Sequence, residues 1–163
     1  MTTHTARPIA PAALKELRRT DDAGRPVASV VDDEGGAPLR CCLRHSEPGE
    51  WVALVSYAPL RRWAAGAGVD PGAYDEQGPV FVHAEACGGP AVDDGGGHPF
   101  DGASRVVRRY SAQGRILGGR LVEEGPGALE DAFAEAFADP AVELVHVRAV
   151  AYGCFLYEVR RPA

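Results

Sequence analysis

The sequence contains a single lysine, a single methionine and no apolar run approaching the ~20 residues that a membrane-spanning helix needs. Cations are also scarce, since 17 basic side chains stand against 23 acidic ones and give a formal net charge of −6. Because nucleic-acid binding requires clustered cations that neutralise phosphates, we expect no nucleic-acid partner, and no membrane partner either. Residues 1–13 lack the basic start and apolar stretch of a secretory signal, so we expect a cytoplasmic protein with reduced cysteines.

No internal repeat, Walker loop or dinucleotide-binding fingerprint is visible in the sequence. The 163 residues fit one domain, and their 45% apolar and 25% charged content is ordinary for a globular protein. We expect a flexible N-terminus over residues 1–8 and a single domain over residues 9–163. The longest segment without periodicity is the Gly/Pro-rich loop 88–104, and a loop of that length is usually either functional or disordered.

Hydrophobic periodicity and turn signals divide the chain into about eight strands and two or three helices. The predicted strands cover residues 27–31, 39–45, 51–57, 80–84, 105–110, 115–122, 142–148 and 152–160. The predicted helices cover residues 11–19, 59–68 and 127–138. Because the strands do not alternate regularly with the helices, we expect an α+β fold with one mostly antiparallel, curved sheet.

Five arginines lie between Asp101 and Glu123 without an intervening acidic residue. They are Arg105, Arg108, Arg109, Arg115 and Arg120. A run of like charge is usually a solvated face, here one side of the hairpin predicted over residues 105–122. The alternative is a face that attracts an anionic partner.

The first group of chemically capable residues is Arg40-Cys41-Cys42-Leu43. In the strand predicted over residues 39–45, Cys41 and Cys42 would point to opposite faces of the sheet. We therefore expect adjacent cysteines that do not share one metal ion, with one thiol in the core and the other at the periphery.

The second group is His83 and Cys87, which lie four residues apart at the end of a predicted strand. Both could turn toward one zinc ion, for which Cys42 and Cys154 would be the remaining ligands. The other interpretation is an ordinary sheet histidine and a buried thiol. Since zinc fingers usually carry two short-spaced ligand pairs and this chain has one, we expect no cofactor, with zinc as the alternative.

The third group comprises His146 and Arg148 on one strand face and Cys154 on the following strand. Histidine can transfer protons near neutral pH, and arginine can hold a carboxylate or phosphate with two parallel hydrogen bonds. Nearby cations could make a thiol more reactive. The alternative is an arginine paired with an acidic residue at the sheet rim and a histidine satisfied by backbone groups.

These segments together resemble a family of uncharacterised bacterial proteins, the domain of unknown function 1203 family. The resemblance runs from about Leu39 to Arg160. It rests on Arg40-Cys41-Cys42-Leu43, Pro48-Gly49-Glu50, Leu54-Val55-Ser56-Tyr57, Tyr74, the segment from Gly78 to Ala84 with Cys87, Val145-His146-Val147-Arg148-Ala149 and Ala151-Tyr152-Gly153-Cys154-Phe155. It implies no settled activity, cofactor or catalytic residue. It suggests that the family pattern contains Arg40, Cys42, His83, Cys87, His146, Arg148 and Cys154. Cys41 stands where we expect the family to have histidine, and Ala149 where we expect asparagine.

Two functions follow from these groups. The first is an enzyme acting on a small anionic metabolite, in which Arg148 and Arg40 hold the anion. His83 or His146 would then be the general acid–base group, and Cys42 or Cys154 the nucleophile. The second is a non-catalytic ligand-binding module, or a homodimeric interaction module, with structural cysteines. The first function requires these side chains to meet in one cleft.

Overall fold

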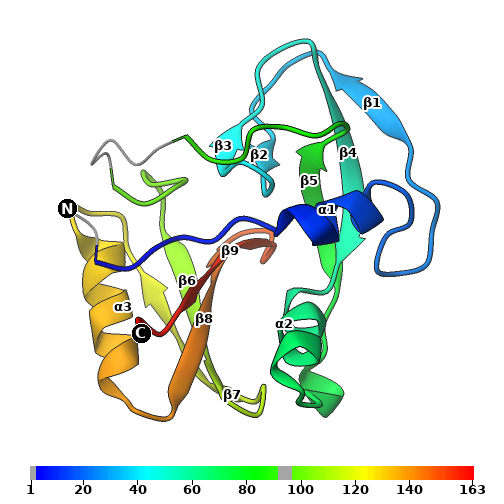
Figure 1. Cartoon of the computed structure of the whole chain (residues 1–163). Coiled ribbons are helices and arrows are strands. Elements are labelled where there is room, and N and C mark those ends of the chain that lie inside the picture. The colour runs from blue at the N-terminus through cyan, green and yellow to red at the C-terminus, as the bar shows by residue number, and fades with distance from the viewer. Residues whose placement is uncertain (1–2, 92–96) are drawn as a thin grey trace.

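The computed structural model describes residues 3–91 and 97–163, and it confirms the α+β fold class (Figure 1). In chain order the elements are α1 (Pro11–Leu17), β1 (Ser29–Asp32), β2 (Pro38–Leu39), β3 (Arg44–His45), β4 (Glu50–Tyr57), α2 (Pro59–Ala67), the 3-10 helix η1 (Gly72–Tyr74), β5 (Gly78–His83), β6 (Arg105–Ser111), β7 (Ile116–Val122), α3 (Ala128–Ala138), β8 (Val142–Ala149) and β9 (Phe155–Arg160). The strands form two sheets rather than the single sheet that we expected.

The first sheet has five strands in the order β1-β4-β5-β2-β3. All its neighbouring strands are antiparallel except β2 and β5, which pair in parallel through Leu39 and Phe81. Its inner face packs on α1, with Val52, Val80 and Leu17 almost fully buried in this core. The strand predicted over residues 51–57 is present as β4. The side chains of Trp51 and Leu54 on this strand are more than half exposed.

The second sheet has four antiparallel strands in the order β7-β6-β8-β9. The hairpin predicted over residues 105–122 is present as β6 and β7, and β8 and β9 form a second hairpin. Helix α3 covers one face of this sheet (Figure 1). The apolar stripe of α3, Leu129, Phe133 and Phe137, is buried against this sheet. A stripe of this spacing buries one side of a helix, because residues four apart lie on the same face.

The prediction of one continuous strand over residues 39–45 is wrong. The chain forms two strands of two residues, β2 and β3, joined by a tight turn over residues 40–43. Leu43 N–H donates to Leu39 O at 2.9 Å, and Leu43 adopts a left-handed φ of 56°. The turn removes the alternation that would have sent Cys41 and Cys42 to opposite faces.

The N-terminal segment and the loop 88–104 both contain buried side chains. Residues 92–96 of the loop 88–104 lie outside the described residues, whereas His98 and Phe100 are buried. Near the N-terminus, His4 is buried and Arg7 N–H donates to Glu158 O at 2.8 Å. No helix within the described parts of the chain has the length and apolar character needed to cross a membrane.

Candidate metal centre

Four side chains converge at one end of the five-stranded sheet. Cys41 and Cys42 come from the turn between β2 and β3, His83 ends β5, and Cys87 follows β5 by four residues. One ligand atom from each of the four lies within 4.8 Å of the others. Both cysteines of the turn are buried, and His83 and Cys87 are half-buried. The tight turn is what brings two consecutive cysteines to the same side of the chain.

Three distances within this cluster, those among Cys41, Cys42 and His83, match a tetrahedral zinc site. Zn–S bonds of about 2.3 Å and Zn–N bonds of about 2.0 Å place neighbouring sulfur atoms about 3.8 Å apart and sulfur and nitrogen about 3.6 Å apart. The Sγ atoms of Cys41 and Cys42 are 3.9 Å apart. Nδ1 of His83 lies 3.5 Å from Cys41 Sγ and 3.7 Å from Cys42 Sγ. These three atoms therefore already form one face of such a tetrahedron.

The other nitrogen of His83 is held by a carboxylate. Nε2 of His83 lies 2.5 Å from Glu50 Oε2, and the carboxylate can only accept this hydrogen bond. Arg44 donates to both oxygens of Glu50, at 2.8 Å and 3.0 Å. With Nε2 protonated, Nδ1 carries the lone pair that faces the sulfurs. Zinc-ligating histidines usually have such a carboxylate partner, which fixes the tautomer and the ring orientation.

The electrostatics of the cluster follow from these contacts. The bidentate hydrogen bonds from Arg44 hold the pKa of Glu50 well below its usual range. Burial opposes charge on His83, but hydrogen bonds with Cys87 and Glu50 raise its pKa. The hydrogen bond with Cys42, together with burial, raises the pKa of the Cys41 thiol, and the same hydrogen bond lowers the pKa of Cys42. Protons are thus shared among the close sulfur atoms of the cluster. A divalent cation would displace these protons and leave thiolate ligands.

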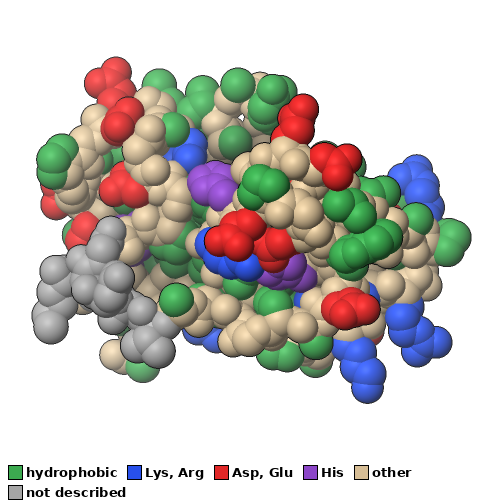
Figure 2. Space-filling model, turned by 90° about the horizontal axis from the view of Figure 1, so that it is seen from above, with side chains coloured by type: hydrophobic (Ala, Val, Ile, Leu, Met, Phe, Trp, Pro, Cys, Tyr) green, Lys and Arg blue, Asp and Glu red, His purple; other side chains and the backbone are tan. Residues whose placement is uncertain are grey.

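An open depression leads to the cluster from the surface. It is lined by Arg44, Gly49, Glu50, Trp51, His83, Glu85, Ala86 and Cys87. Seen from above, histidine, basic and acidic side chains gather near the middle of this side of the molecule (Figure 2). His83 and Cys87 are thus reached from solvent, whereas Cys41 and Cys42 lie behind them.

The family described as "Protein of unknown function (DUF1203)" matches residues 36–161. The chain belongs to this family. All four residues of the cluster, and Glu50 and Arg44, fall within the DUF1203 match. Comparison with curated proteins and with solved structures gave no match.

The predicted site residues do not share one cleft. Cys42 and His83 belong to the cluster. Cys41, and not Cys154, is the further cysteine that joins them. Arg148 and Cys154 line a separate cavity. His146 is fully buried, with Nε2 3.3 Å from Glu158 Oε2. Burial lowers the pKa of His146, which favours the neutral ring.

Arg40 lies behind both sites and is almost completely buried. Its Nε donates to Phe155 O at 2.8 Å, and its Nη1 donates to Pro38 O. Burial lowers the pKa of Arg40 to about 10. These contacts tie the turn that carries the cysteines to the first residue of β9.

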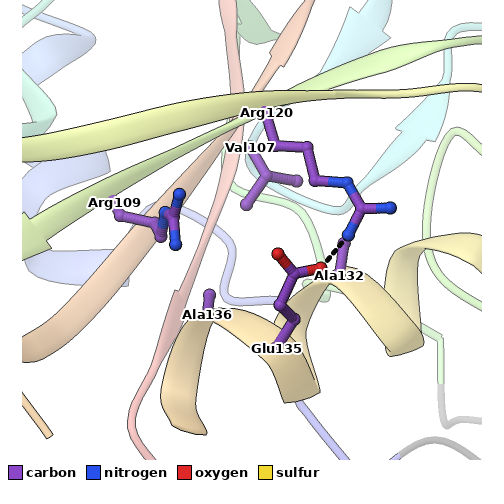
Figure 3. Close-up of a pocket in the computed structure, with 6 residues that line it drawn as sticks. All are labelled: Val107, Arg109, Arg120, Ala132, Glu135 and Ala136. Atoms are coloured by element: carbon purple, nitrogen blue, oxygen red, sulfur yellow. Dashed lines mark hydrogen bonds and ion pairs between the residues drawn. The ribbon is translucent and has the colours of Figure 1, made fainter. Parts of the chain in front are cut away.

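The arginine run is largely paired with acidic groups or backbone. Arg108 donates to Glu76 at 3.0 Å, and Arg105 donates to Phe100 O at 2.6 Å. Arg120 pairs with Glu135 of α3 across a small hollow (Figure 3). Arg109 points into the same hollow between the hairpin and α3 (Figure 3). The solvated-face interpretation therefore accounts for Arg115 and Arg120, which are exposed, better than for the half-buried Arg105, Arg108 and Arg109.

Sequence reasoning missed Cys41 as a partner of Cys42, and it missed Glu50 and Arg44 altogether. Glu50 entered only as part of the Pro48-Gly49-Glu50 segment of the family resemblance, because its contact with His83 depends on the pairing of β4 with β5. In that pairing Val52 lies opposite His83, which brings the first residue of β4 near the end of β5. The sequence signal for this contact was an acidic residue at the start of one strand together with a histidine at the end of its antiparallel partner.

Proposed function

We propose that this protein binds one zinc ion per chain through Cys41, Cys42, His83 and Cys87. The observation that carries the proposal is the spacing of Cys41 Sγ, Cys42 Sγ and His83 Nδ1, at 3.5–3.9 Å, beside a histidine whose other nitrogen is held by Glu50. Thiolate-rich sites favour zinc over magnesium and calcium, which prefer oxygen ligands. Arg44 would offset the charge of a site with three thiolates and one divalent cation.

The zinc ion would be structural. Four protein ligands complete a tetrahedron and leave no position for a water or a substrate, which is typical of structural sites. The ion would join the turn at residues 40–43 to the end of β5 and to the start of the loop that follows. A reducing compartment such as the cytoplasm would keep the three thiols available. This function corresponds to a non-catalytic module with structural cysteines.

Metal analysis tests the proposal. Protein purified without chelators under reducing conditions should contain about one zinc ion per chain, measured by plasma mass spectrometry. The Cys87→Ala variant should lose most of the metal, because it removes the most accessible sulfur ligand. Cys154→Ala is the matched control, since this cysteine is outside the cluster, and it should keep the wild-type content. A metal-free wild-type protein that takes up no added zinc would disprove the proposal.

A second candidate function is a thiol enzyme acting on a small anionic substrate. Cys42, His83 and Glu50 stand in the order of a nucleophile, a base and a group that orients the base, at 3.7 Å and 2.5 Å. Iodoacetamide labelling distinguishes the two functions. One fast-labelling cysteine in protein that is isolated metal-free would support the enzyme. Slow labelling that becomes fast when a chelator removes zinc would support the structural ion.

A further inference from the structure

A second cavity, of about 160 Å³, is lined by residues at the ends of β4 and β8 and at the starts of β5 and β9. Its apolar walls include Tyr57 at the end of β4, Pro79 on β5 and Phe155 at the start of β9. Its polar groups include Arg148 at the end of β8 and the thiol of Cys154. The rings of Tyr57 and Phe155 meet edge to face, with centroids 5.6 Å apart. The cavity is therefore a mostly apolar space with a cation in its wall.

Arg148 has unused hydrogen-bonding capacity in this wall. Its Nε donates to Gly153 O at 2.9 Å, and this is the one hydrogen bond that it makes to the described residues. Its Nη2 lies 3.6 Å from Glu76 Oε2, beyond hydrogen-bonding distance. Glu76 is held more closely by Arg108, at 3.0 Å and 3.2 Å. Within the described residues Nη1 of Arg148 makes no hydrogen bond, and Nη2 makes only the longer ion pair with Glu76, so both amino groups can donate to a ligand.

The charges around the cavity favour a single negative charge in it. Arg40, behind Cys154, makes its hydrogen bonds to carbonyl oxygens and forms no ion pair within the described residues. A buried cation without a counter-charge is costly, so an anion in the cavity would stabilise this arrangement. The Glu76 carboxylate in the lining opposes a ligand with two or more negative charges.

We propose that this cavity binds a small organic monocarboxylate with an apolar body, its carboxylate held by the two terminal amino groups of Arg148. The planar guanidinium matches a carboxylate with two parallel hydrogen bonds. The apolar body would pack on Tyr57 and Phe155, and cavities of this composition are typical of small-molecule sites. The proposal does not depend on zinc, because the four residues of the metal cluster do not line this cavity.

A titration of the wild-type protein with benzoate tests the chemistry of the ligand. Two-dimensional amide NMR spectra at constant ionic strength should show saturable shifts centred on Gly78, Gly153 and Phe155. Benzamide has the same shape without the charge. It should bind at least about tenfold more weakly, because it loses the charged hydrogen bonds with Arg148. Inorganic phosphate should also bind more weakly than benzoate. Absence of saturable benzoate binding, equal binding of benzamide, or tighter binding of phosphate would each overturn the proposal.

Two variants test whether Arg148 binds the carboxylate. Arg148→Met keeps most of the side-chain volume and should weaken benzoate binding at least about tenfold. Arg115→Met, an exposed arginine in the turn between β6 and β7, should bind benzoate like the wild type. Equal affinity of Arg148→Met and the wild type would overturn the assignment. If Arg148→Met does not fold, the comparison of benzoate with benzamide on the wild-type protein still decides the question.

Discussion

His83 presents its two ring nitrogens to different partners. Nδ1 lies among the sulfurs of Cys41 and Cys42, and Nε2 lies against the carboxylate of Glu50. Glu50 is in turn fixed by two hydrogen bonds from Arg44. This chain of contacts sets which nitrogen is available as a ligand before any ion arrives. At the scale of the residue, the strength of the site depends on a side chain that does not touch the metal.

The Glu50→Gln variant tests this dependence. An amide keeps the shape of the side chain but loses the negative charge that holds the imidazole N–H, so zinc affinity should fall by about 10–100-fold. Competition with a chromophoric zinc chelator measures the affinity. Glu47→Gln is the control, because this exposed residue contacts Glu50 through its backbone N–H. Unchanged zinc affinity in Glu50→Gln would show that the carboxylate has no part in the site.

The sequence predicted some of these residues and not others, for physical reasons. His83, Cys87 and Cys42 carry ligand chemistry at recognisable spacing, so they could be proposed as zinc ligands. Cys41 could not, because its direction depends on whether residues 39–45 extend or turn. Whether Cys154 shares a face with Arg148 depends on strand register, which the sequence leaves open; the two residues line one cavity, whereas His146 is buried against Glu158. Whether a residue is buried depends on strands that are far away in the chain, so the alternation of side chains within one strand cannot predict burial.

At the scale of the element, the hairpins and α3 were predictable because their periodicity extends over six or more residues. The region from β2 to β3 was not, because two strands of two residues carry no periodic pattern. This region is instead shaped by backbone conformation. Gly35 has a φ of +74°, and a Cβ there would lie 2.9 Å from Pro48 N and 3.0 Å from Ser46 O. The loop before β2 therefore approaches the turn before β4 closely at Gly35.

Substitution of Gly35 should weaken this part of the fold. Gly35→Ala adds a clash with the backbone to the strain of a left-handed conformation, so it should lower the free energy of unfolding by about 2–3 kcal/mol. Gly36→Ala is the matched control, because Gly36 has a φ of +88° with open space around it. It should cost about 1 kcal/mol from strain alone. Urea unfolding measures both values, and equal losses would show that the close approach costs nothing.

A second element-scale feature joins α3 to the N-terminal segment and to the loop after β5. His4 Nδ1 donates to Glu130 Oε1 at 2.7 Å, and His98 Nε2 donates to Glu130 Oε2 at 2.8 Å. Burial alone would raise the pKa of Glu130, but hydrogen bonds from His98, His4 and the Thr3 N–H lower it to about 2. A carboxyl group with a depressed pKa stabilises the fold above its unfolded pKa, and that contribution disappears as the pH falls toward the folded pKa.

The Glu130→Gln variant should therefore be less stable in a pH-dependent way. At pH 7 its free energy of unfolding should be about 2 kcal/mol below that of the wild type. The difference should narrow by about 1 kcal/mol at pH 3.5, because the unfolded wild-type chain then takes up a proton that the folded chain does not. Glu135→Gln, on the exposed side of α3, serves as the control. A difference that is constant from pH 7 to pH 3.5 would contradict the assigned role of the Glu130 charge.

At the scale of the whole molecule, each sheet has its own hydrophobic core. The larger sheet packs with α1, and the smaller one packs with α3. Phe155 at the start of β9 belongs to the core of the larger sheet, which links the two halves. The proposed zinc ion lies entirely within the larger sheet, so its contribution to stability should be unevenly distributed.

Removal of the metal should expose this asymmetry. Treatment with a high-affinity zinc chelator should lower the melting temperature, and readdition of zinc should restore it. Amide hydrogen exchange should speed up first in β2, β3 and β5, while β6 and β8 keep their protection. Cys154→Ala should respond to the chelator as the wild type does. Exchange that accelerates equally in both sheets would show that the ion does not act locally.

The positions of the four candidate ligands along the chain have a consequence for biosynthesis. All of them lie among the first 87 residues, and the strands of the smaller sheet begin at Arg105. A ribosome would therefore deliver every ligand before it has translated the strands of the smaller sheet. A nascent chain could then capture its ion co-translationally, and the captured ion would hold the β2–β3 turn and β5 together as a template on which the later residue Phe155 docks.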